Sequence, residues 1–571
     1  MSLRQQLFYA IPCMAFLVSP LAAANDITIQ AGSVSPIGSS PVTSNTLGAA
    51  DIQNFLENTG SLVITTDLGS GGVGNITIAA GVNISWSSGN NLTLFANNRL
   101  SAGSGTLLQS QNSKITLIIT ELDLPVLSAG VISAGNGIDI LPSTQGASLA
   151  LGDTSSASIS IGSAELAALN PGSRPFVLGN SSSPLGIVNL DSLDLSGFTG
   201  GLSLYATSVT GGNIEVPGLK ITTTTGNITL GDLTTRGIGL DLLSNGGPIS
   251  IGEILADGNS GSPVMISGSS SLTTGNIDTS GSVGNGGNVT LDFAGSVETG
   301  NVNTSGTQGG NVFFNSLNRI TAGTIDSSGT VGNGGNVTLD PPGDVEVVSI
   351  DARGGALGTG GTVLVQTGSD FRATGTVDGT SSILASGGTG PGSITLEYGT
   401  LNPSILQIGN ATLHGTAGSV ADGVTTLTAG QTFISSFTSG QIALNTDGII
   451  LTESAGSTSA VEGGGDDSFT LQLEEDPAGQ ADILVSGGTQ LLVSSNNVTF
   501  GPSATLNLTS VAPATIYVRA VNDGTGEGNH SGDITFTVSG TSTQYNGFPL
   551  TNLNVSLSEA PSTVKEWEAL N

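Results

Sequence analysis

The chain has 571 residues, of which 87 are glycine and only 9% are charged. Lys and Arg total 11 against 43 Asp and Glu, so the formal net charge is −32 at pH 7. That balance argues against nucleic-acid partners, because such proteins need clustered Lys and Arg to contact phosphates. A hydrophobic content of 37% argues against a long disordered chain, and aromatic residues make up only 4%, so a core would consist mainly of Val, Ile and Leu.

Residues 1–24 have the pattern of a secretory signal. Arg4 supplies a positive start, an apolar stretch follows, and three alanines end the segment before Asn25. The alternative is a retained membrane anchor, but the apolar stretch is short for a spanning helix. The single cysteine, Cys13, lies inside this segment, so the mature chain would contain neither disulfides nor thiolate metal sites. We expect an exported protein, extracellular or on the cell surface or outer membrane of a bacterium, with no transmembrane span after cleavage.

Residues 25–60 are less regular than the chain that follows. They include an amphipathic stretch, AADIQNFL, at positions 49–56. A stack of strands needs a cover on its first edge, because an open edge pairs with other chains. We therefore predict that residues 25–60 form an N-terminal cap.

Internal repetition dominates the chain from residue 61 to 445. The segment 281–292 returns almost unchanged at 329–340, and the second glycines of four Gly-Gly pairs stand at 287, 310, 335 and 361. These steps of 23, 25 and 26 residues indicate a solenoid. Leucine-rich repeats share the period, but their fixed Leu and Asn spacing is missing.

Each repeat predicts β-strands. A turn rich in Gly, Asn and Ser precedes a short alternation such as Asn288-Val289-Thr290-Leu291. Two or three strands per coil of about 24 residues describe a right-handed parallel β-helix, with the paired glycines expected at corners of positive φ. We expect Val289, Val312 and Val337 to stack in the interior. The asparagines that precede them, Asn288, Asn311 and Asn336, should form a polar ladder.

Parts of this region resemble a known family. Residues 71–78 and 84–94, GGVGNITI and ISWSSGNNLTL, resemble the repeats of bacterial filamentous-haemagglutinin-type surface proteins, and the segment 371–376 resembles a block in their cyanobacterial relatives. The resemblance implies a β-helix displayed on the cell surface. It also implies a role in adhesion.

Residues 446–560 resemble the Calx-β-like domain of bacterial surface proteins, on the segments 452–454, 461–464 and 521–532. The resemblance implies a small antiparallel β-sandwich, with strands at 469–473 and 534–538, followed by a tail over 561–571. It also implies calcium ligands, carried over to Glu462, Asp523 and Glu527. The alternative is that these are solvated loop carboxylates.

No catalytic or cofactor-binding site is predicted. The solenoid's basic residues show no repeated pairing with acids along the sequence; they are Arg99, Lys114, Arg174, Lys220, Arg236, Arg319, Arg353 and Arg372. Both histidines, His414 and His530, are expected to be exposed loop residues. Asp292 and Asp340 occupy equivalent coil positions with a turn or ladder role, and Trp86 is expected to fill a wide coil.

These observations favour a structural or adhesive protein over an enzyme. A long row of similar strands suits weak multivalent contact with cell-surface or matrix glycans or proteins, and it also permits self-association. Two alternatives stay open. One is a carbohydrate-active lyase or hydrolase, which needs acids and a base in one groove, and the other is a calcium-dependent spacer in a surface layer.

Overall fold

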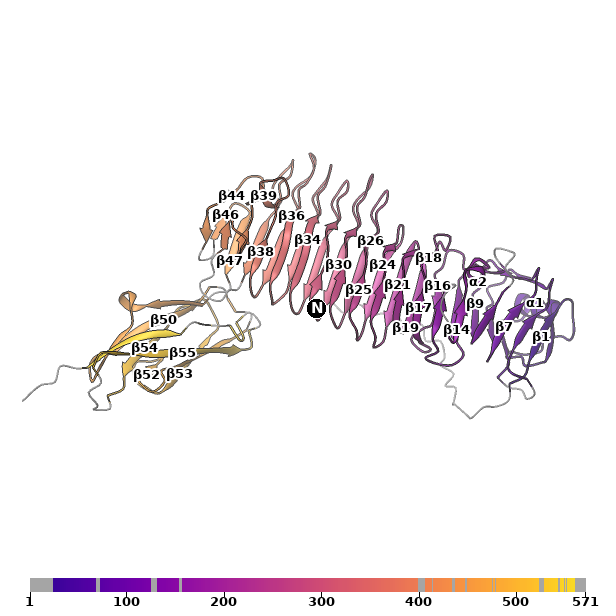
Figure 1. The fold of residues 1–571 in the computed structure, drawn as a ribbon, viewed down its shortest axis with the longest axis horizontal. Coiled ribbons are helices and arrows are strands. Elements are labelled where there is room, and N and C mark those ends of the chain that lie inside the picture. The colour runs from indigo at the N-terminus through magenta and orange to yellow at the C-terminus, as the bar shows by residue number, and fades with distance from the viewer. Residues whose placement is uncertain are drawn as a thin grey trace, which may run out of the picture. The chain divides into compact units, whose positions relative to one another are not determined.

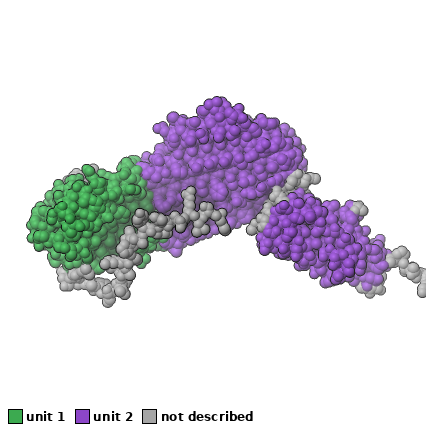
Figure 2. Space-filling view, turned by 180° about the vertical axis from the view of Figure 1, so that it is seen from behind, with its two compact units in different colours: residues 1–212 green, residues 213–571 purple. Residues whose placement is uncertain are grey.

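The computed structural model describes residues 24–67, 72–124, 131–152, 157–398, 406–412, 414–433, 437–446, 449–474, 476–477, 479–522, 528–542, 545–548, 550 and 552–559. The chain divides into two compact units, residues 1–212 and 213–571 (Figure 2). The predicted signal, apart from Ala24, and the predicted tail lie outside the described residues.

Nearly all the regular structure is β. The described helices are α1 (Ala49–Asn58), α2 (Ser163–Ala167) and a short 3-10 turn (Ser454–Gly456). Within the part of the chain that the structure describes, neither α-helix is long and apolar enough to cross a bilayer.

The first unit is built mainly from parallel strands, most of which pair with the strand one coil away. One sheet contains β1 (Ile27–Gln30), β2 (Thr46–Gly48), β4 (Ile76–Ile78), β7 (Arg99–Ala102) and β10 (Glu121–Asp123). A second contains β5 (Asn83–Trp86), β8 (Leu107–Ser110), β11 (Ile132–Ala134) and β15 (Leu169–Asn170). A third series runs through β3 (Leu62–Thr65), β6 (Leu92–Phe95), β9 (Ile115–Ile119), β12 (Ile138–Pro142), β16 (Phe176–Leu178) and β19 (Leu202–Gly211). The remaining strands are β13 (Leu149–Leu151), β14 (Ile159–Ile161), β17 (Leu185–Leu190) and β18 (Leu193–Asp194).

The predicted cap contributes both a strand and a helix to this unit. Strand β1 pairs in parallel with β4, so stacking begins at Ile27. Helix α1 buries Ile52, Phe55 and Leu56, and this apolar stripe arises because the three residues recur at helical spacing. The role of residues 25–60 as a cap stays a prediction.

The second unit begins with three series of parallel strands, drawn as successive rungs in Figure 1. The first is β21 (Gly218–Thr223), β24 (Gly239–Ser244), β27 (Val264–Gly268), β30 (Val289–Phe293), β33 (Val312–Ser316), β35 (Val337–Asp340), β37 (Val363–Thr367), β40 (Ile394–Tyr398) and β47 (Ile442–Thr446). The second is β22 (Ile228–Leu230), β25 (Ile249–Ile251), β28 (Leu272–Thr274), β31 (Val297–Glu298), β34 (Ile320–Asp326), β36 (Val345–Asp351), β38 (Phe371–Ala373) and β42 (Gly415–Thr416). The third is β20 (Ile214–Glu215), β23 (Leu233–Thr234), β26 (Ile254–Leu255), β29 (Ile277–Asp278) and β32 (Val302–Asn303); it joins the second at β34 and continues from β36 to β39 (Ser381–Leu384) and β43 (Ser419–Ala421).

The predicted stacking of the valines is confirmed. Val289 pairs with Val312, and Val312 pairs with Val337. All three side chains are at most 1% exposed. The parallel β-helix-like architecture therefore follows from the repeat: residues one coil apart take the same place and cover each other's apolar surface.

The expected reason for the Gly-Gly pairs is wrong. None of the eight glycines in these pairs has a positive φ. The cause is the close approach of neighbouring coils: a Cβ on Gly335 would overlap the carbonyl oxygen of Gly310, and a Cβ on Gly361 would overlap that of Gly335. Glycine is needed here because backbone lies directly on backbone, and its freedom of φ is not used.

Parallel stacking gives way to hairpins over residues 406–446. Three pairs become antiparallel: β41 (Leu406–Ile408) with β45 (Thr432–Phe433), β43 with β44 (Thr426–Leu427), and β46 (Phe437–Ser439) with β47. The hairpin strands occupy backbone groups that a further parallel coil would need. They are a means of closing the edge of a sheet.

Residues 449–559 form two further sheets. One has the order β48 (Ile449–Glu453), β50 (Asp467–Leu473), β54 (Ala514–Ala520), β52 (Leu491–Ser494), and the other has the order β49 (Ser459–Glu462), β56 (Leu553–Glu559), β55 (His530–Gly540), β51 (Ala481–Ser486), β53 (Ser503–Leu508). Apolar side chains from both, among them Phe469, Ile483 and Val538, belong to one buried cluster. The predicted strands 469–473 and 534–538 lie in β50 and β55. One pair, β49 with β56, is parallel.

Candidate functional site

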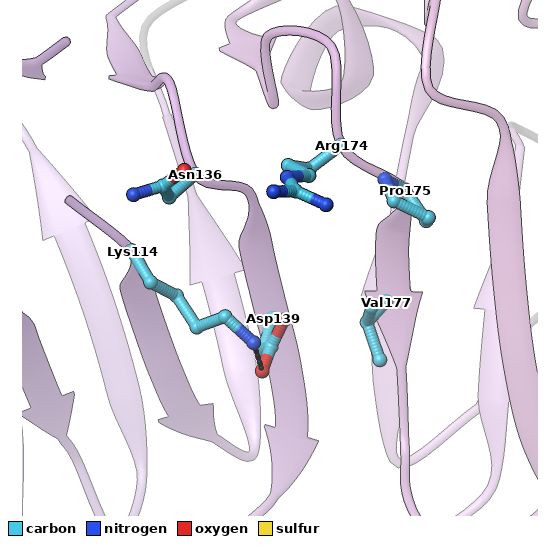
Figure 3. Close-up of a pocket in the computed structure, with 6 residues that line it drawn as sticks. All are labelled: Lys114, Asn136, Asp139, Arg174, Pro175 and Val177. Carbon is cyan, nitrogen blue, oxygen red and sulfur yellow. Dashed lines mark hydrogen bonds and ion pairs between the residues drawn. The ribbon is translucent and has the colours of Figure 1, made fainter. Parts of the chain in front are cut away.

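A groove of about 400 Å³ opens on the surface of the first unit (Figure 3). It lies over three neighbouring parallel strands, β9, β12 and β16, at the ends where these strands begin. Its lining residues are Lys114, Asn136, Asp139, Arg174, Pro175 and Val177. They come together because they occupy similar positions in three successive coils.

Two cations and one carboxylate meet in this groove. The Lys114 Nζ lies 2.8 Å from Asp139 Oδ2, and the Asp139 side chain is only 15% exposed. No ion pair or side-chain hydrogen bond joins Arg174 to any other described residue, so the group carries one uncompensated positive charge. An uncompensated positive charge on a strongly acidic protein favours binding of an anionic group.

The groove lacks the paired carboxylates of a glycoside hydrolase. Asp139 is its single acid, and Lys114 already neutralises it. The Asn136 amide donates to the Asn112 carbonyl at 2.5 Å, which fixes its orientation. Pro175 and Val177 supply an apolar wall. This set of groups suits binding of an anion better than proton transfer.

The basic residues do pair with acids in a repeated way, contrary to the sequence-based expectation. Five of the eight in the solenoid contact an acid 21–26 residues away, one coil along: Arg99 with Asp123, Lys114 with Asp139, Lys220 with Asp241, Arg236 with Asp257 and Arg372 with Glu346. The signal was present in the sequence as opposite charges one period apart. Such exposed pairs add little stability each.

His414 lies in a bend outside the strands, as predicted, but the prediction that it is exposed is wrong. Its side chain is 6% exposed, its Nδ1 accepts a hydrogen bond from the Phe371 backbone N–H at 3.0 Å, and its ring centre lies 4.6 Å from that of Tyr398. Burial lowers the pKa of His414 to about 4. The hydrogen bond also requires an unprotonated Nδ1, so this histidine is a neutral core residue.

The prediction that His530 is an exposed loop residue is wrong. It is the first residue of β55 and is partly buried. Trp86 is buried as predicted: its Nε1 donates to the Asn90 carbonyl at 2.8 Å and to Ser113 Oγ at 2.9 Å. Its indole therefore belongs to the interior.

The candidate calcium ligands are only partly described. Glu462 is the buried last residue of β49 and is in register with Glu559 of β56. Glu559 Oε1 accepts from the Gly528 backbone N–H at 2.7 Å. Asp523 and Glu527 lie outside the described residues, and among those described no three His, Cys, Asp or Glu side chains gather as a metal site would require. Calcium binding stays a prediction.

The asparagine ladder exists, with a different bonding pattern. Asn288 Oδ1 accepts from the Asn311 backbone N–H at 2.8 Å, and Asn311 Oδ1 accepts from that of Asn336 at 2.9 Å. The amides thus bond to the backbone of the next coil and not to one another. Asp292 and Asp340 also lie in a ladder, on strands and in register with Asn315, whose Nδ2 donates to Asp292 at 2.7 Å.

No protein-family model matches the chain, and a search of curated proteins found no match. The resemblances to filamentous haemagglutinins and to Calx-β domains accordingly stay predictions.

Proposed function

We propose that this protein is an exported or cell-surface structural β-helix protein with an adhesive role, making weak multivalent contacts with cells or matrix. In this proposal the solenoid is a right-handed β-helix. The two C-terminal sheets form a Calx-β-like sandwich that follows it in the chain. The partners are surface or matrix glycans or proteins.

One observation carries the proposal: successive coils present the same outward positions in strict register. Thr290 pairs with Phe313, Phe313 with Thr338, and Thr338 with Leu364, so outward side chains recur at the strand spacing of about 4.8 Å. A ligand that contacts one coil weakly meets an outward side chain at the equivalent position of the next coil. Many weak contacts then add up through a high effective concentration.

Deleting the gene tests the proposal at the level of the cell. We expect weaker attachment to surfaces or weaker cell–cell aggregation, restored when the gene is supplied again. The protein should also appear in the medium or the envelope fraction when cells are fractionated. Unchanged attachment and aggregation, together with a protein confined to the cytoplasm, would contradict it.

A calcium-dependent spacer is the second candidate, because Glu462 and Glu559 are neighbours in register and Glu559 binds the backbone of Gly528, next to the segment that holds Asp523 and Glu527. Calorimetry of the purified chain with calcium or with a chelator tests this. The candidate is supported if calcium raises the melting temperature of the unaltered chain and does not raise that of the Glu462→Gln variant. An identical melting temperature in calcium and chelator refutes it.

A further inference from the structure

Arg174 is unusual among the basic residues of the solenoid. Six of the eight contact an acid, and Arg174 and Arg319 have no such contact with any described residue. Arg174 lines the groove described above, which also holds the cation of Lys114, whereas Arg319 is not among the residues that line this groove. The net charge of the chain is −32, so an arginine without an acidic partner beside a lysine is a rare region of positive charge on it.

We propose that this groove binds the anionic group of an acidic sugar residue within a polysaccharide, either a carboxylate or a sulfate ester. The proposal rests on the proposed function, since it names a glycan class for the adhesive protein. The planar guanidinium of Arg174 presents two parallel N–H donors that match two oxygens of a carboxylate or sulfate. Lys114 offers further donors, because its ammonium has three N–H bonds and one points at Asp139.

The backbone holds Arg174 firmly over the groove. A Cβ on Gly200, one coil along, would overlap the Arg174 carbonyl group. On the other side, a Cβ on Gly137 would lie 3.3 Å from the Arg174 Cβ. Pro175 follows and restricts Arg174 to extended backbone. The segment is therefore packed between two glycines, which fixes where the arginine side chain begins.

Asp139 limits the charge of the site. With Lys114 neutralised, the group is singly positive, which suits one anionic group at a time. A volume of about 400 Å³ is in the range of small-molecule pockets, and Pro175 and Val177 offer apolar contact to sugar C–H groups. The open groove on the outside of the strands allows a longer chain to pass.

Affinity electrophoresis of the purified full chain tests this, in gels containing polygalacturonate, dextran sulfate or neutral dextran. We expect retardation by polygalacturonate, dextran sulfate or both, weakening with salt, and none by neutral dextran. Retardation by polygalacturonate alone means that the groove binds a carboxylate. Retardation by dextran sulfate alone means that it binds a sulfate ester. Retardation by both means that it binds an anionic group of either kind. No retardation in either acidic gel overturns the proposal.

Arg174→Gln should weaken this binding about tenfold or more, because charge-assisted hydrogen bonds are lost. Arg174→Lys should be intermediate, since it keeps the charge and loses the fork. Arg319→Gln is the matched control, with the same change of net charge away from the groove, and should bind like the unaltered chain. Equal affinities for Arg174→Gln and the unaltered chain, or equal losses in both Gln variants, overturn the proposal.

The two proposals can fail separately. If deletion of the gene weakens adhesion but the purified chain does not bind acidic polysaccharides, the adhesive function is supported and the proposed site is refuted. If Arg174→Gln abolishes binding and gene deletion leaves adhesion unchanged, the site stands and the adhesive function falls. Equal melting temperatures for both Gln variants and the unaltered chain exclude unfolding as the cause.

Discussion

Each asparagine of the ladder links two coils. Asn311 Oδ1 accepts from the Asn336 backbone N–H, while its own backbone N–H donates to Asn288 Oδ1. The last link passes from Asn336 Oδ1 to the Thr362 backbone N–H at 2.9 Å. Just before each strand begins, the asparagine side-chain oxygen thus accepts the kind of hydrogen bond that a backbone carbonyl accepts within a strand. This bond helps to set the register of the next coil.

Removing one hydrogen bond of the ladder should lower the free energy of unfolding by a small amount. Asn311→Ala leaves the Asn336 N–H to water, and we expect unfolding to become easier by about 1 kcal/mol. Asn318→Ala is the control, because this exposed asparagine makes no side-chain hydrogen bond with the described residues. Urea denaturation measures both. Equal stabilities for the two variants would show that the ladder contributes nothing.

His414 should make the protein less stable in mild acid. Its pKa is about 4 in the folded protein because the ring is buried, against about 6.5 in an unfolded chain. Above pH 6.5 both states are neutral and the full stability is present. As the pH falls from 6.5 to 4, the unfolded chain takes up a proton that the folded protein excludes, so stability is lost by up to about 3 kcal/mol.

The measurement compares the unaltered chain with His414→Gln. Melting temperatures at several pH values between 7 and 4 give the difference between the two proteins. That difference should shrink steadily below pH 6.5, since only the unaltered chain carries this histidine. A difference independent of pH would mean that His414 is protonated equally in both states.

At the scale of the element, the shape of each coil depends on close packing of its glycine turn against the equivalent turn of the next coil. Gly287, Gly310, Gly335, Gly361 and Gly392 form one column, and a Cβ on each of the last four would overlap the carbonyl oxygen of the glycine one coil before. Strands above and below these turns keep their spacing only if the column stays free of side chains. This explains why the Gly-Gly pair is the most regular part of the repeat.

A methyl group in this column should be costly. Gly335→Ala would push two backbones apart, and we expect a loss of about 1–3 kcal/mol. Gly390→Ala is the control, because a Cβ there meets only the Thr359 methyl group, at 3.6 Å. Thermal unfolding followed by circular dichroism compares them. A Gly335→Ala protein as stable as Gly390→Ala would contradict close stacking as the reason for the glycine.

At the scale of the whole molecule, a solenoid should tolerate loss of a complete coil. Deleting residues 289–311 joins Asn288 to Val312, so the next coil takes the place of the missing one. We expect a folded protein with a slightly lower melting temperature, because each coil contacts only its neighbours. Deleting only residues 289–300 removes half a coil and misaligns every later strand. Far-ultraviolet circular dichroism should show cooperative melting for the first deletion and a marked loss for the second; equal effects would contradict the stacked architecture.

The sequence by itself determined the stacked parallel strands. Two local signals suffice for this: the alternation at Val289 and Leu291 specifies a strand, and the period of 23–26 residues places equivalent strands over each other. Both act through neighbours in the chain or through copies of the same pattern. The stacking of Val289, Val312 and Val337 was therefore predictable.

Only the tertiary structure decided which unlike residues meet. The burial of His414 beside Tyr398 depends on the irregular coils near residue 410, and the hairpins over 406–446 interrupt the period altogether. The groove of Lys114 and Arg174 arises where coils of unequal length bring two cations together. A repeat specifies what its copies share. Where copies differ, the contacts of a residue depend on which other residues lie near it in the folded protein. The period of the repeat does not specify those contacts.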